Sequence, residues 1–257
     1  MDDHQIKKDV QRQFSQNAEK YVASESHAKG DDLSLMVDWL DPNPDWMAID
    51  IATGGGHVTK ALSSHVSTIF ATDLTNQMLA TAKKHLDSTC NNVWYVQADA
   101  ESLPFLDSTF DLAVCRIAAH HFPNPELFVQ EVHRVLKPGG KFLLIDNVAP
   151  DDKGLDQFVN TLEKLRDPSH GRSYTINEWK KLFRSSSFIE VRSSNRKKTY
   201  SFPVWVSRTA TTEEQVQEVQ NHLCLANDTV KNYFAITIED GQILSLHVDE
   251  LMILLEK

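Results

Sequence analysis

Apolar residues recur every three or four positions over residues 9–40, with a break in the pattern at 24–30. Residues at that spacing share one face of a helix, so the pattern predicts helices on either side of the break. Residues 41–44, Asp-Pro-Asn-Pro, are turn formers and end this helical region. The apolar positions that carry the spacing are Val10, Phe14, Ala18, Leu33, Val37 and Leu40.

From residue 46 onward, short apolar runs alternate with segments of helical spacing. A short apolar run suits a strand that is covered on both faces. Strands that alternate with helices over short connections indicate βαβ units. The pattern therefore predicts an α/β fold with a doubly wound, mostly parallel sheet and helices on both faces. The runs lie at 46–52, 66–72, 93–98, 110–115 and 141–148, and the helical segments at 57–64, 75–86 and 125–136.

The alternation loosens after residue 150. We expect helices at 155–165, 176–183 and 213–225, a strand at 188–191, and either a strand or a helix at 247–255. We interpret this part as completing the same sheet, with an insertion near 199–240. The chain is thus expected to divide into an N-terminal helical segment (1–40), a core (41–150) and a C-terminal completion (151–257).

Composition and charge exclude several classes of protein. No stretch approaches the ~20 apolar residues that a membrane-spanning helix needs, so we expect no stable membrane insertion. The polar, acidic N-terminus does not resemble a secretory signal. A net charge of −10 disfavours nucleic acid as a partner. The three cysteines lie far apart, which predicts no metal site and suits a reducing cytoplasm.

Three of the only 9 glycines are consecutive, at residues 54–56, directly after the first predicted strand and before a helix. Without a Cβ, the backbone there can turn tightly and approach a ligand. The following helix N-terminus offers free N–H groups to an anion. Asp73 closes the second predicted strand, where a carboxylate can accept hydrogen bonds from ribose hydroxyls. These features predict a nucleotide-binding turn.

The residues around this turn narrow the choice of nucleotide. The dinucleotide fingerprint needs a third small residue where Thr59 stands, and the Gly-Lys-Ser/Thr of a P-loop is missing. Instead, Asp50 precedes the loop. The segment 50–56, Asp-Ile-Ala-Thr-Gly-Gly-Gly, resembles the loop of class I S-adenosylmethionine-dependent methyltransferases, which reads Asp/Glu-x-Gly-x-Gly-x-Gly. Ala52 replaces the first glycine and restricts positive φ at that point.

Further segments resemble the same family in the same order. They are the third-strand motif at 97–105, the fourth-strand motif at 110–116 and the turn before strand five at 136–141. The segment 14–21 is similar to the lid helix of the ubiquinone/menaquinone-biosynthesis-type members. The resemblance covers about residues 10–148 and implies a seven-stranded Rossmann-like sheet.

This resemblance implies a set of residues that bind S-adenosyl-L-methionine. In the family, an Asp after strand three reaches the adenine amino group and the next backbone N–H reaches a ring nitrogen. The lid would cover the sulfonium end. The expected cofactor-binding residues are Tyr21, His27, Asp50, Ala52, Gly54, Gly56, Asp73, Leu74, Met78, Asp99, Ala100 and Arg116. Several of these residues have a structural alternative. These are Gly54 and Gly56 as a left-handed turn with close strand–helix packing, Asp50 as a cap of the loop, Asp73 as a helix-capping acid, Asp99 as an ordinary loop acid, Met78 as core, and Arg116 as the partner of an acid.

His120 and His121 follow the fourth strand, where this architecture places the substrate. Either could act as a general base, because histidine titrates near neutral pH. The alternative is that they pack beside Phe122 and cap the turn. Adjacent histidines lack the convergent spacing of a metal site. The basic run 192–198 is expected to be a solvated strand face or a protected sheet edge, with an anionic substrate or a membrane surface as the alternative.

The sequence therefore predicts a methyltransferase that acts on a small-molecule acceptor by in-line methyl transfer. The N-terminal resemblance suggests an apolar aromatic acceptor. A non-catalytic S-adenosylmethionine-binding module and a nicotinamide-dependent oxidoreductase are the alternatives. The choice among C-, O- and N-methylation, and the oligomeric state, stay open.

Overall fold

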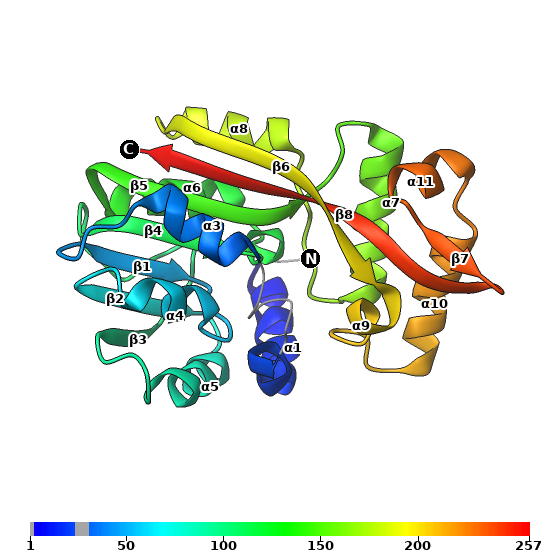
Figure 1. Ribbon diagram of the computed structural model, residues 1–257, viewed down its shortest axis with the longest axis horizontal. Helices are drawn as coiled ribbons and strands as arrows, with labels where there is room; N and C mark the ends of the chain where they lie inside the picture. The colour runs from blue at the N-terminus through cyan, green and yellow to red at the C-terminus, as the bar shows by residue number, and fades with distance from the viewer. Residues whose placement is uncertain (1–2, 24–30) are drawn as a thin grey trace.

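A computed structural model describes residues 3–23 and 31–257, with side chains for 3–15 and 32–257. One sheet runs through this part of the chain (Figure 1), and seven of its strands follow a single path, in the order β3-β2-β1-β4-β5-β8-β6. The strands are β1 (Met47–Ile51), β2 (Thr68–Asp73), β3 (Val93–Gln97), β4 (Phe110–Arg116), β5 (Leu136–Val148), β6 (Ile189–Ser201), β7 (Thr237–Glu239) and β8 (Gln242–Glu256). The short β7 is an eighth strand that pairs with β8 beside the path.

The first five strands are parallel, whereas β8 runs antiparallel to both β5 and β6. This confirms the predicted α/β fold with a mostly parallel sheet. The chain moves from β1 outward through β2 to β3 and then returns to the other side of β1 with β4. The carboxyl ends of β1 and β4 therefore form a topological switch point, where open α/β sheets bind ligands.

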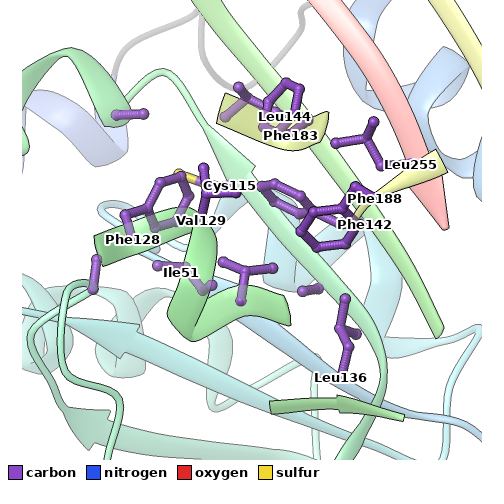
Figure 2. Close-up of a cluster of buried hydrophobic side chains, with 14 of the residues drawn as sticks. Ile51, Cys115, Phe128, Val129, Leu136, Phe142, Leu144, Phe183, Phe188 and Leu255 are labelled. Carbon is purple, nitrogen blue, oxygen red and sulfur yellow. The ribbon is translucent and has the colours of Figure 1, made fainter. Parts of the chain in front are cut away.

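Helices cover both faces of the parallel part because its strands bury side chains on both sides. Phe142 and Leu144 of β5 pack in a cluster with α6 and α8 (Figure 2), and Leu143 and Ile145 pack in another with α3 and α4. This alternation follows from the two-residue period of a strand. The helices are α3 (Asp31–Leu40), α4 (His57–Ser63), α5 (Asn76–Leu86), α6 (Pro125–Val135) and α8 (Ile176–Ser185), and η1 (Ala119–His121) is a short 3₁₀ turn.

A second group of helices surrounds the far ends of β6 and β8. Both strands extend beyond the parallel part of the sheet (Figure 1). A separate hydrophobic cluster there includes Trp205, Val219 and Leu246. Its helices are α7 (Lys153–Arg166), α9 (Phe202–Val206), α10 (Glu213–Cys224) and α11 (Asp228–Tyr233). The N-terminal helix α1 (Asp3–Ala23) packs against α5.

Several predicted boundaries differ from the structure. The expected turn at 136–141 is a bulge inside β5, because Leu136 already pairs with Phe110 before the register shifts to Leu112 and Lys141. The expected short strand at 188–191 extends to Ser201, because β6 pairs with β8 along its whole length. The segment 247–255, left open between strand and helix, belongs to β8.

The basic run 192–198 lies on β6, which ends the strand path, so its expected place at a sheet edge is confirmed. The run is also partly solvated, since Arg192 and Lys197 are exposed, but some of its cations are paired with acids. Arg196 pairs with the buried Glu250 at 2.5 Å between Nη2 and Oε1, and Lys197 pairs with Asp249 at 2.9 Å. Part of this run therefore neutralises acids of β8.

Among residues 3–23 and 31–257, no helix combines the length and apolar content that a membrane span needs. The same residues contain no group of three or more His, Cys, Asp or Glu side chains arranged to hold a metal ion. Cys90, Cys115 and Cys224 are all free thiols.

Candidate functional site

A cavity opens at the carboxyl ends of β1 and β4 and extends over the end of β2. Its empty space, including open solvent at its mouth, is about 1020 Å³. The glycine loop, the loop after β3 and the segment after β4 contribute its walls, and α1 contributes Lys7, Val10 and Phe14. The cavity thus occupies the switch point of the sheet, where a ligand is expected.

The glycine loop turns through left-handed backbone conformations. Ala52, Gly54 and Gly56 have φ angles of 56°, 55° and 82°. For an L-residue other than glycine this region costs roughly 1–2 kcal/mol, so Ala52 adopts the geometry of the missing glycine at a cost. Ala52 and Gly54 line the cavity.

Gly56 has a different place in the loop, because it is not among the residues that line the cavity. A Cβ at Gly56 would lie 2.8 Å from Leu86 Cδ1, which is too close for any real contact. The glycine therefore allows the start of α4 to approach α5. Its contact with a cofactor stays a prediction.

Asp50, at the end of β1, is buried and holds the loop to α4. Its Oδ2 accepts hydrogen bonds from Thr53 Oγ1 at 2.6 Å, Thr59 Oγ1 at 2.7 Å and Thr59 N at 3.0 Å. The capping alternative is thus present in the structure, and Asp50 also lines the cavity. Burial raises the pKa of Asp50 to about 6, although these hydrogen bonds oppose the shift.

Asp73, at the end of β2, joins the loop to α5. Its Oδ2 accepts the backbone N–H of Gly54 at 3.1 Å, and its Oδ1 accepts that of Thr75 at 2.8 Å. Thr75 occupies the N-cap position of α5 without a capping bond from its own side chain. Burial raises the pKa of Asp73 to about 6. A buried carboxylate at the cavity wall fits a ligand that presents hydroxyl donors.

Leu74, Met78, Asp99 and Ala100 line the same end of the cavity. Met78 is 1% exposed, so it belongs to the buried interior as well as to the cavity wall. Asp99 Oδ1 accepts the backbone N–H of Glu101 at 3.0 Å. Its Oδ2 lies 2.6 Å from Lys7 Nζ of α1, a contact between residues 92 positions apart.

Arg116 ends β4 beside the cavity, and its side chain is paired with an acid, as the alternative interpretation expected. Its Nε lies 2.5 Å from Oδ2 of Asp32 on α3, and both side chains are buried. Burial alone would raise the pKa of Asp32, but the Arg116 guanidinium, together with the charges of Lys198 and Arg196, outweighs burial and lowers it. Ile117 follows with φ of 53° and also lines the cavity. Such a conformation is an outlier for a β-branched residue.

The two histidines after β4 have different environments. His121 lines the cavity, and its Nδ1 lies 3.0 Å from the carbonyl oxygen of Ser169. A carbonyl can only accept, so this contact assigns the proton to Nδ1 and leaves Nε2 as an acceptor. Burial and the neighbouring His120 lower the pKa of His121 to about 4, so the ring is neutral. Phe14 of α1 packs edge-on against it at 5.0 Å between ring centroids.

His120 does not line the cavity. Its Nδ1 lies 2.6 Å from Oδ1 of the buried Asp146, and its backbone N–H donates to Oδ2 of the same carboxylate at 2.9 Å. Burial lowers the pKa of His120, but the Asp146 charge outweighs burial and raises it overall. His120 is therefore placed behind His121, at 4.3 Å between ring centroids.

Two predicted site residues cannot be placed. His27 lies outside the described residues, and Tyr21 lies on α1 with its side chain outside the described part. Sequence reasoning missed Lys7 and Ile117 in the cavity wall and Asp146 behind it. Lys7 continues the helical spacing of Val10 and Phe14, and Asp146 is a lone acid in the apolar run 141–148. Neither feature of the sequence indicated which residue Lys7 or Asp146 would contact.

The chain is similar to known methyltransferases. Residues 49–144 match a family described as methyltransferase domain. A protein of Bacillus subtilis (strain 168) named "Uncharacterized methyltransferase YcgJ" is 36% identical over 242 residues, 93% of this chain and 96% of that protein. A ubiquinone/menaquinone biosynthesis C-methyltransferase UbiE, from Blochmanniella pennsylvanica (strain BPEN), is 33% identical over 146 residues, 54% of this chain and 58% of the relative. A solved structure from Bacillus halodurans C-125 has a TM-score of 0.86 at 37% identity, covering 89% of this chain and 99% of that one.

Proposed function

The chain belongs to the class I S-adenosylmethionine-dependent methyltransferases, and we propose that it transfers the methyl group of S-adenosyl-L-methionine to a small-molecule acceptor. The observation that carries this proposal is the wall of the cavity at the switch point. There the carboxylates of Asp50 and Asp73 are buried beside a left-handed glycine loop. That combination fits a ligand with hydroxyl donors and a positive charge.

Each end of the cavity suits one part of this cofactor. Asp73 would accept the ribose hydroxyls, while Asp99 and the backbone N–H of Ala100 would contact the adenine edge. Asp50 and the backbone around Arg116 would lie near the methionine portion. The apolar and backbone part of the cavity wall would come from Ala52, Gly54, Leu74 and Met78. When bound, the cofactor supplies an activated methyl group on a sulfonium, which a nucleophile can displace in line.

The protein's own contribution is binding, orientation and exclusion of water. Positioning two reactants can supply ~7–11 kcal/mol of the barrier, so a strong general base is not required. We infer that α1 acts as a lid over the cavity, since Lys7, Val10 and Phe14 line it. We extend this proposal to the whole segment 1–40. Tyr21 and His27 would belong to the same lid.

The acceptor end of the cavity is mainly apolar. Phe14, Ala118, Phe122 and Pro123 line it, and His121 is the titratable group among them. With its proton on Nδ1, His121 offers Nε2 as a hydrogen-bond acceptor. We propose that His121 orients a hydroxyl or N–H group of a small, apolar aromatic acceptor. His120, paired with Asp146, would keep the His121 ring neutral and correctly placed.

Calorimetry tests the proposal directly. S-adenosyl-L-methionine and S-adenosylhomocysteine should both bind with heat evolved, and the absence of binding by either would overturn it. Asp73→Ala should weaken binding by about 1–3 kcal/mol, the usual range for a charge-assisted hydrogen bond. Asp87→Ala is the matched control, because Asp87 lies at the exposed end of α5 and pairs with Lys83.

Turnover needs a second measurement because the acceptor is unknown. A panel of phenols, anilines and aliphatic amines, each with the cofactor, can be screened for release of S-adenosylhomocysteine. We expect activity with an aromatic hydroxyl or amine and none with charged aliphatic amines. A preference for aliphatic amines would contradict the proposed acceptor class without affecting cofactor binding. The cytoplasmic location predicted from the sequence stays a prediction, supported by the three free cysteines.

A further inference from the structure

The helix α1 presents one face to the cavity. Lys7, Val10 and Phe14 lie three and four residues apart, so they share that face, and all three line the cavity. Val10 contributes an apolar side chain, and Phe14 packs edge-on against His121. Lys7 is the cation that α1 places over the predicted adenine end.

The Lys7 ammonium bridges two carboxylates from the loop after β3. Its Nζ lies 2.6 Å from Asp99 Oδ2 and 2.5 Å from Glu101 Oε2. The Glu101 side chain is only 4% exposed, so the second contact is largely shielded from water. Burial lowers the pKa of Lys7, but its hydrogen bonds to both acids outweigh burial and raise it. The ammonium is therefore charged across the neutral range.

Glu101 connects this contact to the rest of the site. Its Oε1 accepts the backbone N–H of Asn124 at 2.6 Å, and Asn124 is the N-cap of α6. The segment between β4 and α6 carries His121, so Glu101 joins the lid, the adenine end and the acceptor end. Two neutral hydrogen bonds also join α1 to the rest of the protein. They run from Gln11 Nε2 to the carbonyl oxygen of Leu74 at 3.0 Å and from Gln13 Nε2 to that of Thr209 at 3.2 Å.

We propose that Lys7 is a positioning residue that holds α1 closed over the bound cofactor and sets the rate at which the cofactor exchanges. This inference rests on the proposed function, because it takes Asp99 as the acceptor of the adenine amino group. Lys7 and the amino group then share the Asp99 carboxylate. Glu101 gives Lys7 a second, shielded carboxylate, so the lid stays closed while Asp99 serves the adenine.

Stopped-flow measurement of S-adenosylhomocysteine release tests the proposal. Lys7→Met keeps the length of the side chain and removes its charge, and should accelerate release by about tenfold or more, as expected for loss of charge-assisted hydrogen bonds. Lys7→Arg should restore slow release, because it restores the charge. Lys8→Met is the matched control: it removes the same charge from an exposed neighbour on α1 and should leave the rate unchanged.

A second variant and a second measurement distinguish faster cofactor release from a general folding defect. Glu101→Gln should also accelerate release, since its amide can still accept the Asn124 N–H but no longer pairs with the ammonium. Hydrogen exchange of the α1 amides should be faster in Lys7→Met than in Lys8→Met, with both variants unfolding at the same temperature as the wild type.

The outcomes separate this inference from the proposed function. If wild-type protein binds S-adenosylhomocysteine and Lys7→Met releases it at the wild-type rate, the role of Lys7 is wrong and the cofactor assignment stands. If the wild type binds neither S-adenosylhomocysteine nor S-adenosyl-L-methionine, the proposed function itself fails.

Discussion

The carboxylate of Asp73 holds the glycine loop in place, because its Oδ2 accepts the backbone N–H of Gly54 at 3.1 Å. The same side chain is our candidate for the ribose hydroxyls. It is buried, and burial raises its pKa to about 6. One ionised group at the cavity wall therefore supports the loop and is expected to contact the ligand.

Cofactor affinity should depend on pH through Asp73 and Asp50, whose pKa values both lie near 6. Only the ionised carboxylates accept hydrogen bonds at both oxygens, so a proton competes with the cofactor. Affinity should be constant above about pH 7 and fall below pH 6, by about tenfold per pH unit for each group. Calorimetry between pH 5 and 8 measures this. Asp73→Asn should give a shallower fall, and a flat wild-type profile would contradict the prediction.

Ala52→Gly should stabilise the protein, because Ala52 has φ of 56° where the family has glycine. Removing a left-handed strain of roughly 1–2 kcal/mol is partly offset by the greater entropy of an unfolded glycine. We expect a gain of about 0.5–1 kcal/mol in the free energy of unfolding, measured with urea. Ala48→Gly, at a buried position of β1, should instead cost about 1–2 kcal/mol from lost burial and backbone entropy. Equal losses in both variants would refute the strain.

Gly56→Ala should cost more than Gly139→Ala, although both glycines have positive φ angles of 82° and 74°. A Cβ at Gly56 would meet Leu86 Cδ1 at 2.8 Å, whereas a Cβ at Gly139 would meet nothing within 4 Å. We expect about 1–2 kcal/mol of conformational strain at Gly139, and a further 1–3 kcal/mol of overpacking at Gly56. Thermal and urea unfolding measure the difference. Similar losses would mean that α5 moves away at little cost.

Asp146→Asn should destabilise the protein most at low pH. The Asp146 carboxylate raises the pKa of His120 above its usual 6.5, so the pair's stabilisation is fully present below that value. It is lost as pH rises through the raised pKa. The gap in unfolding free energy between wild type and variant should be about 3 kcal/mol at pH 6, as for a broken buried ion pair, and narrower at pH 9.

A histidine with the opposite shift is the control for this pH dependence. Burial lowers the pKa of His133 below its usual 6.5, so His133 is almost wholly neutral from about pH 7.5 to 9 in both folded and unfolded protein. His133→Gln should therefore show a gap from wild type that does not change over that range. A gap for Asp146→Asn that is equally constant would show that His120 is not charged in the folded protein.

The cofactor end of the site could be predicted from the sequence because its acidic residues lie at the ends of predicted strands. Asp50 lies near the end of an apolar run, and Asp73 and Asp99 follow one. Parallel strands bring their carboxyl ends to one edge of the sheet. The contacts across the cavity could not be predicted in this way. Lys7 meets Asp99 over 92 positions, and no local pattern relates two residues so far apart.

The sequence by itself determined the α/β alternation, the nucleotide-binding turn and the family, because these depend on short periods and on contiguous residues. Only the tertiary structure decided how the polar groups pair. It places Arg116 on Asp32, His120 on Asp146 and Lys7 on Asp99, each from a different element. Buried charges must find partners, and which partner lies within hydrogen-bond distance depends on how helices and strands pack rather than on their order in the chain.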